Sequence, residues 1–273
     1  MTQFENNTAF YRSRLTRDVV IAQLGPKAFS IVTDAAARSD YLEFHGSVNS
    51  SPDVRGYVLI NDRSFDGHLE LEELVRLIVT DETEHYVGGA YRGMLHDVIA
   101  AQFRNSVGDI FFNMIKFEKP AVAGFQGKIR SEYLGWTLAY DSRIATTDTV
   151  FEFDNARIGI PASPGVTYLM PRYIGLGKTM SLLHSGETID AAEALSLGLI
   201  SDVVDDRENL EERCMQEIQN FTKHHPHIHK AHKKLMRPTG TEISQALERF
   251  YKQASDSIVA LRSSRTNTHE QTK

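Results

Sequence analysis

The sequence predicts an α/β fold, and three observations support that prediction. Short apolar runs of strand length alternate along the chain with longer segments whose apolar residues recur at helical spacing. Apolar residues make up 41% and charged residues 24% of the 273 residues, which is ordinary for a globular protein. The sequence shows no internal repeat and no low-complexity segment that would divide it. Strands that alternate with helices indicate a sheet covered by helices.

The first predicted unit is strand, helix, strand. Residues 18–24 form an apolar run that a Gly-Pro pair ends, and residues 56–60 form a second run that an Asn-Asp pair ends. Between them, residues 30–48 carry apolar side chains at helical spacing. This order predicts two parallel strands joined by a crossover helix.

The next segment, residues 65–89, is acidic and irregular, and two interpretations stay open for it: a mobile lid or a solvated helix. The clearest helix covers residues 91–117, where apolar residues recur every three or four positions. The pair Lys119-Pro120 ends it.

The remaining elements are shorter. They are, in order, a strand at 121–125, a helix at 132–140, strands at 143–146 and 150–153, helices at 165–174, 178–183 and 191–195, and a strand or turn at 200–204. A helical region follows from Asn209, and the polar tail from Arg262 is expected to fray.

Charge and cysteine content narrow the function classes. The chain has 30 Lys and Arg against 36 Asp and Glu, a net charge of −6, which argues against nucleic acid as a partner. Cys214 is the only cysteine, so no intrachain disulfide and no cysteine-based zinc site can form. The segment Met1–Phe10 is unlike a secretory signal, and no apolar run reaches the roughly 20 residues of a membrane span. We therefore predict a cytoplasmic protein with no membrane partner.

Motifs between residues 119 and 204 carry a family resemblance. Residues 119–127 read Lys-Pro-Ala-Val-Ala-Gly-Phe-Gln-Gly, and Asp141 closes the helix that follows. Residues 185–194 read Ser-Gly-Glu-Thr-Ile-Asp-Ala-Ala-Glu-Ala, with Leu-Gly-Leu-Ile at 197–200. In this order and spacing the segment resembles the enoyl-CoA hydratase/isomerase, or crotonase, superfamily. Weaker similarity covers residues 19–60 and the helical tail.

This resemblance implies a fold and a ligand. The fold would be α/β, with a crotonase-like spiral of ββα units over residues 1–205 and a C-terminal helical region over residues 206–273. That helical region would serve in trimerisation and in covering CoA. The implied partner is an acyl-CoA or acyl-carrier thioester, with no separate cofactor. The implied assembly is a homotrimer or a dimer of trimers.

The resemblance also implies an oxyanion hole of two backbone N–H groups. The first maps to His68, in Phe65-Asp66-Gly67-His68-Leu69, although this segment is one residue short and has Leu69 where the family has Asp. The second maps to Glu132, because Ser-Glu-Tyr at 131–133 replaces the family's Gly-Gly-Gly. Fixed donors aimed at developing negative charge contribute about 3–4 kcal/mol each.

The hydratases of the family also use two glutamates, and the matching positions hold Gly135 and Asn155. Glycine has no side chain, and an amide exchanges no proton near neutral pH, so ordinary hydration is not predicted. The catalytic candidates are therefore His68, Glu132 and Asp154, with Asn155 at the second glutamate position. The alternative is that Asp154 caps a turn and Glu132 caps a helix.

A histidine-rich segment lies in the tail, with five histidines between residues 224 and 232. Imidazoles at this spacing can bind zinc, but residues 223–237 contain no carboxylate and several lysines. A solvated basic helix start is the favoured interpretation, so no metal site is predicted. Lys233 and Lys234 become the candidate contacts for the phosphates of CoA.

Two functional hypotheses follow. The first is a divergent crotonase-type enzyme, a lyase, isomerase or hydrolase, that acts on a thioester through an oxyanion hole. The second is a non-catalytic acyl-CoA-binding or assembly subunit of the same fold. The sequence does not identify the acyl group.

Overall fold

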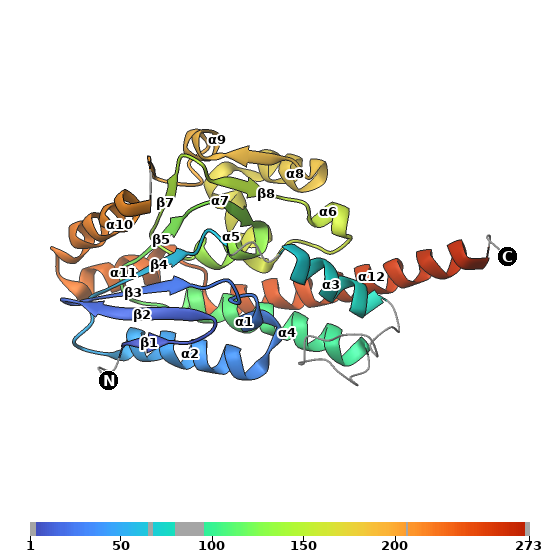
Figure 1. The fold of residues 1–273 in the computed structure, drawn as a ribbon, viewed down its shortest axis with the longest axis horizontal. Helices are drawn as coiled ribbons and strands as arrows, with labels where there is room; N and C mark the ends of the chain where they lie inside the picture. The colour runs from blue at the N-terminus through green and yellow to red at the C-terminus, as the bar shows by residue number, and fades with distance from the viewer. Residues whose placement is uncertain (1–3, 65–67, 80–95, 206, 271–273) are drawn as a thin grey trace.

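The computed structural model describes residues 4–64, 68–79, 96–205 and 207–270. Within these residues the strands form a mixed seven-stranded sheet and a small three-stranded sheet. The strands of the large sheet are, in spatial order, β1 (Asn6–Asn7), β2 (Tyr11–Thr16), β3 (Val19–Leu24), β4 (Gly56–Asn61), β5 (Ala121–Phe125), β7 (Ser142–Thr146) and β10 (Asp202–Val204). The strands from β3 to β10 run parallel, and β1 and β2 form an antiparallel edge (Figure 1).

The small sheet consists of β6 (Lys128–Arg130), β8 (Val150–Glu152) and β9 (Thr188–Asp190). Two consecutive units share one plan, in which a strand of the large sheet is followed by a strand of the small sheet and then a helix. The first unit is β5, β6 and α5 (Ser131–Thr137), and the second is β7, β8 and α6 (Asn155–Ile158). Both helices therefore begin directly beyond the small sheet, and this places their N-terminal residues near one another.

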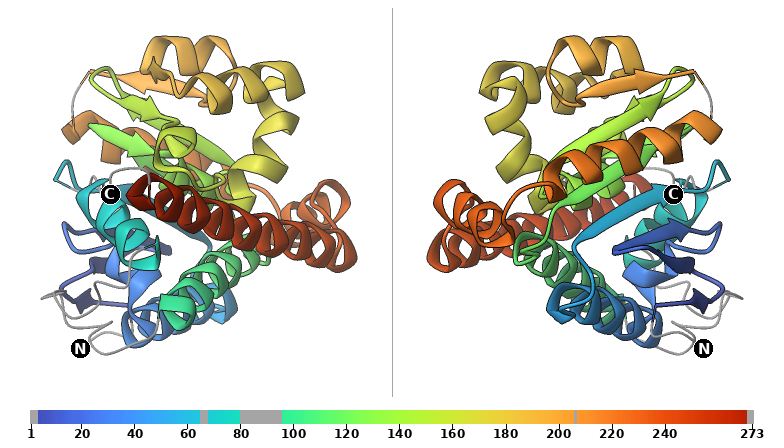
Figure 2. Two further views of the ribbon diagram at one scale, coloured as in Figure 1. Left: turned by 90° about the vertical axis from the view of Figure 1, so that its right-hand side faces the viewer. Right: turned by 90° about the vertical axis from the view of Figure 1, so that its left-hand side faces the viewer.

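Helices cover both faces of the large sheet. On one face lie α1 (Ser30–Thr33), α2 (Ala35–Ser50) and α4 (His96–Ile115), whose apolar side chains join the main core. On the other face α10 (Arg207–Thr222) packs Leu210, Cys214 and Ile218 against the sheet in a second, smaller core. Figure 2 shows these helices on either side of the strands.

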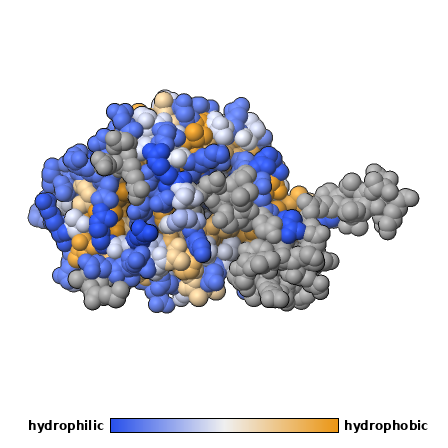
Figure 3. All heavy atoms as spheres, in the orientation of Figure 1, coloured by the Kyte–Doolittle hydropathy of each residue, from blue (hydrophilic) through white to orange (hydrophobic). Residues whose placement is uncertain are grey.

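After α6 the described chain is helical apart from β9 and β10. Besides α10, its helices are a π-helix (Gly165–Leu169), α7 (Met170–Ile174), α8 (Leu176–Ser185), α9 (Ala191–Ser196), α11 (Pro226–Met236) and α12 (Gly240–Glu270). The long helix α12 lies beside α4 and α3 (His68–Val79), and the Arg262 guanidinium donates to the carbonyl oxygen of Ile78 (Figure 2). None of the helices in the described ranges combines the length and apolarity that a membrane span requires. The face shown in Figure 3 is largely hydrophilic, with scattered apolar side chains.

The predicted α/β alternation and the parallel pair of β3 and β4 are confirmed. Several details differ. The strands β1, β2, β6 and β9 and the helix α6 have no counterpart among the predicted elements. The single helix expected at 30–48 is broken because Asp34 is extended and its carboxylate accepts hydrogen bonds from the N–H groups of Ala36 and Ala37. The helix α12 includes the tail from Arg262 and extends to Glu270, and the expected fraying of this tail stays a prediction.

The two interpretations of the acidic segment 65–89 are settled in part. Residues 68–79 form the helix α3, and four of its apolar side chains are buried, so it is not a fully solvated helix. The buried residues are Leu71, Leu74, Val75 and Ile78. The rest of the segment lies outside the described residues.

Candidate active site

The first turn of α5 places Glu132 beside the start of α6. Arg130 precedes α5 as its N-cap, in an extended conformation and without a side-chain capping bond. The first N–H groups of a helix have no intrahelical acceptor, and this includes the N–H of Glu132. This N–H is the predicted second donor of the oxyanion hole.

Glu132 and Asn155 form a hydrogen-bonded pair. The Asn155 Nδ2 donates to Glu132 Oε1 at 2.6 Å, and the Ser131 hydroxyl lies 3.2 Å from the same oxygen and within hydrogen-bond distance of Asn155 Oδ1. The other oxygen, Glu132 Oε2, is buried and accepts no hydrogen bond from any described residue. Its charged neighbour is Arg130, whose Nε lies 3.5 Å away. One oxygen of this carboxylate is thus held in place while the other lacks a donor.

Asp154 is held by two guanidinium groups. Its Oδ1 lies 2.8 Å from Nη2 of Arg130, which is buried, and its Oδ2 lies 2.7 Å from Nη2 of Arg157. Arg157 also donates to Glu72 of α3 at 2.9 Å, and its hydrogen bonds to Asp154 and Glu72 raise the pKa of Arg157. Asp154 precedes α6 as its N-cap, but its side chain makes no capping bond. Asp154 therefore links two arginines.

The space beside Gly135 is filled. A Cβ atom added at Gly135 would lie 2.2 Å from the Ser163 hydroxyl, and one added at Gly165 would lie 2.0 Å from the Gly135 carbonyl oxygen. α5 and the π-helix therefore touch through their backbones. The Ser163 hydroxyl is buried and has no hydrogen-bond partner among the described residues.

Glu132 also lines a small hollow with aromatic and cationic walls. Its lining residues are Phe29, Val32, Lys128, Arg130, Glu132, Tyr133 and Trp136. This hollow adjoins the N-terminus of α5, where the second N–H donor was predicted.

The first half of the predicted oxyanion hole falls largely outside the described residues. This applies to residues 65–67 and to the side chain of His68. The main chain of His68 begins α3. The roles assigned to His68 stay predictions.

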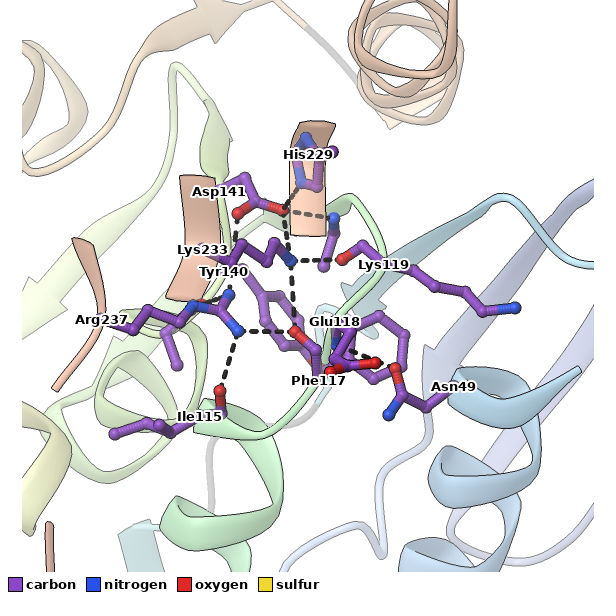
Figure 4. Close-up of polar contacts among 12 residues, drawn as sticks. Asn49, Ile115, Phe117, Glu118, Lys119, Tyr140, Asp141, His229, Lys233 and Arg237 are labelled. Atoms are coloured by element: carbon purple, nitrogen blue, oxygen red, sulfur yellow. Dashed lines mark hydrogen bonds and ion pairs between the residues drawn. The ribbon is translucent and has the colours of Figure 1, made fainter. Parts of the chain in front are cut away.

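The two lysines predicted to contact CoA, Lys233 and Lys234, lie in different surroundings. Lys233 of α11 is buried, and its ammonium group donates to the carbonyl oxygens of Phe117 and Lys119 and to Asp141 Oδ2 at 2.8 Å (Figure 4). Burial lowers the pKa of Lys233 to about 8, against the opposing effect of Asp141. Three acceptors for three N–H groups leave no donor for a phosphate, so the position of Lys233 does not suit the predicted contact. Lys234 is exposed, with Glu118 3.8 Å away.

Sequence reasoning missed the residues that hold the candidate carboxylates. Arg157 lies three positions after Asp154, a helical spacing that could have indicated their ion pair, whereas the spacing of Arg130 and Glu132 gave no such signal. No sequence signal could have placed Ser163 against Gly135, because that contact depends on how α5 meets the π-helix.

Comparisons with known proteins identify the family. The sequence model described as Enoyl-CoA hydratase/isomerase matches residues 75–268, most of the chain. The chain is 30% identical over 140 residues to crotonyl-CoA hydratase of Syntrophomonas wolfei, which covers 50% of this chain and 54% of that protein. It is 36% identical over 100 residues to the peroxisomal bifunctional enzyme of Cavia porcellus, covering 37% of this chain and 14% of that protein. The matched segments thus span about half or less of these relatives.

Solved structures agree on the fold. The enoyl-CoA hydratase structure from Bacillus halodurans superposes with a TM-score of 0.77 at 21% identity, covering 95% of this chain and 99% of that one. This likeness confirms the predicted crotonase-like α/β fold with its C-terminal helices. Because the family model matches most of the length of this chain, the chain belongs to the enoyl-CoA hydratase/isomerase family.

Proposed function

We propose that this protein is an acyl-CoA enzyme whose acid–base step uses a single carboxylate, that of Glu132. The observation that carries the proposal is the asymmetry of that group: Asn155 and Ser131 hold Oε1, while Oε2 is buried without a hydrogen-bond donor among the described residues. A buried acceptor without a partner is costly, so it is expected where a ligand supplies the missing donor.

The chemistry follows from the number of carboxylates. Removing a proton from the carbon beside a thioester carbonyl gives an enolate, and the N–H groups of Glu132 and His68 would donate to its oxygen. One base that returns the proton to another carbon is enough for an isomerisation. Ordinary hydration would need the two family glutamates, which we propose this chain lacks, since Gly135 and Asn155 stand in their places. We therefore favour proton transfer over water addition.

Asp154 is the weaker candidate for the base. Both of its oxygens bind guanidinium groups, which occupy the lone pairs that a base needs. We assign it a positioning role, in which it orients Arg130 toward Glu132.

A second candidate function is acyl-CoA binding without turnover. It is favoured by the filled space at Gly135, where the Ser163 hydroxyl lies, and by the amide at position 155. In that case Glu132 would position a ligand without exchanging a proton.

For the region 206–273 we propose a role in assembly and in covering CoA, with Lys234 as a phosphate contact. α11 exposes two large apolar side chains, Leu235 and Met236, which are 82% and 76% accessible. Exposed apolar side chains of this size are typical of surfaces that bind another chain. A homotrimer or dimer of trimers is the expected assembly, and sedimentation equilibrium would measure it.

The test compares Glu132→Gln with the wild type on a panel of 2-enoyl and 3-enoyl thioesters of CoA. Loss of a general acid–base group should lower kcat by about 10²–10⁴-fold while the affinity for a saturated acyl-CoA changes little. Glu152→Gln is the matched control, because Glu152 is a partly buried carboxylate that pairs with Lys128 at 3.8 Å. Acyl-CoA binding without product in the wild type would favour the second candidate. Wild-type turnover that survives Glu132→Gln would refute the role of Glu132.

A further inference from the structure

A narrow cavity lies where α3, α4, α12 and the segment after α6 meet. α12 contacts both α3 and α4, and the three helices run close together in both views (Figures 1 and 2). The lining residues are Val75, Ile78, Ala100, Phe103, Arg104, Ile160, Pro161, Phe250, Ala254 and Ile258. Among these described residues, Arg104 is the one that carries a charge.

We infer that this cavity receives the far end of the acyl group and that Arg104 selects acyl groups ending in a carboxylate or a similar anion. The inference rests on the proposed function, since it assumes an acyl-CoA ligand at Glu132. It goes beyond that function by naming the chemical class of the acyl group.

Arg104 is incompletely satisfied within the described structure. One of its Nη atoms donates to the Ser255 hydroxyl, and its guanidinium carbon lies 5.8 Å from the centre of the Tyr251 ring. Its Nε atom is buried and has no hydrogen-bond partner, and no described carboxylate pairs with the group. A charged donor that is buried without a partner has a cost, and a bound anion would remove it.

The neighbours of Arg104 hold its stem in one place. The Tyr251 hydroxyl lies against Gly108, one turn after Arg104, so closely that a Cβ atom at Gly108 would come within 1.8 Å of it. α12 therefore packs tightly on α4 at this point. With the aliphatic part of the Arg104 side chain held in place, its Nε–H group has a defined position. Selective recognition of an anionic acyl group requires such a fixed donor.

The cavity is connected along the chain to the candidate active site. Ile160 and Pro161 form part of its wall, and they lie between Asn155, which binds Glu132, and Ser163, which lies against α5. The Arg157–Glu72 ion pair ties the same segment to α3. The segment 155–163 therefore takes part both in the candidate active site and in the wall of the cavity that Arg104 lines.

Size and polarity agree with this assignment. The cavity measures about 20 Å³, room for one group the size of a water molecule, such as a carboxylate oxygen. The apolar walls would part to admit the methylene groups. A site that pairs a buried donor with a ligand oxygen discriminates strongly against ligands that lack the oxygen.

The experiment measures binding by calorimetry with stable CoA analogues in which CH₂ replaces the thioester sulfur. Dicarboxylic acyl groups of four to eight carbons are compared with monocarboxylic acyl groups of the same length. The wild type should bind the diacid form at least tenfold more tightly at one length or more. Arg104→Met should abolish that preference while the affinity for the monoacid form stays within about threefold.

Arg249→Met is the matched control, because Arg249 is an exposed arginine on α12 that does not line the cavity, and it should keep the preference. A purely structural Arg104 would lower the melting temperature of Arg104→Met without changing the ratio of affinities. That result, or no diacid preference at any length, would overturn the inference while monoacid binding still supports the proposed function. If neither series binds, the proposed function itself fails.

Discussion

The charged clusters around Asp141 and around Glu132 differ in how completely the polar atoms of their described residues are paired. Around Asp141, Lys233 donates to three oxygens, and Arg237 donates to the carbonyl oxygens of Ile115, Phe117 and Ala139 (Figure 4). Around Glu132, the carboxylate Oε2 and the nearby Ser163 hydroxyl have no hydrogen-bond partner in the described structure. Both clusters contain buried cations, so burial alone does not distinguish them.

The difference separates two uses of buried charge. The Asp141 cluster joins α11 to the ends of α4 and α5, segments far apart in sequence, and its donors are used by backbone carbonyls. It behaves as a structural clamp. The Glu132 cluster leaves acceptors open at a helix N-terminus, where a ligand can complete them. Incomplete pairing, more than charge, is therefore the feature that marks a candidate site here.

The largest expected effect comes from breaking the saturated cluster. Asp141→Ala would leave the buried Lys233 and the partly buried Arg237 without their carboxylate, and breaking a buried ion pair from one side costs about 3–5 kcal/mol. Urea unfolding at neutral pH measures this loss. Glu193→Ala, which breaks an exposed pair with Lys178 at 2.9 Å, should cost less than about 1 kcal/mol. Equal losses for the two variants would contradict the comparison.

The sequence carried different amounts of information about the two clusters. Local patterns predicted the strand β8 and the helices α4 and α5 near them, because apolar periodicity and turn residues act over short distances, but not the short elements β6 and α6. The sequence also singled out Glu132, Asp154 and Asn155, through the family resemblance. It assigned Lys233 to a ligand, since no local signal shows that Asp141, ninety-two positions earlier, takes up its charge. Pairing between distant segments is decided by packing, and this is where sequence reasoning stopped.

Lowering the pH should reduce the free energy of unfolding through His45. His45 packs against Phe117 at 4.3 Å between ring centroids, and burial lowers its pKa to about 3, from 6.5. Below pH 6.5 the His45 imidazole therefore binds a proton in the unfolded chain but not in the folded chain. As a result, stability is lost as the pH falls from 6.5 toward 3. The loss approaches about 1.4 kcal/mol per pH unit from this group.

His45→Phe should flatten that part of the pH dependence, although it is less stable at pH 7 because Asn113 loses its hydrogen-bond partner. Urea unfolding at pH 7.0, 6.0 and 5.0 compares the slopes of the two proteins. An unchanged slope in the variant would mean that other groups carry the acid sensitivity.

A smaller effect is expected at the contact between α5 and the π-helix. Gly135→Ala forces a methyl group against the Ser163 hydroxyl, and overpacking of this kind costs about 1 kcal/mol or somewhat more. Ser163→Ala removes that oxygen, so the double variant should recover most of the loss. Thermal unfolding of the two single variants and the double variant measures the coupling. Additive losses would show that the hydroxyl is not the obstacle.

The smallest change in stability should come from the residue on which the proposed function depends. Glu132→Gln keeps an oxygen that accepts from Asn155 and Ser131, and it removes a buried charge whose second oxygen lacks a donor. The lost attraction to Arg130 is offset in part because Asp154 still binds that guanidinium. We expect a change within about 1 kcal/mol of the wild type in either direction, as is common when a functional group is replaced at a ligand site. A loss as large as that of Asp141→Ala in the same urea series would mean that Glu132 serves the fold, and the two clusters would then be of one kind.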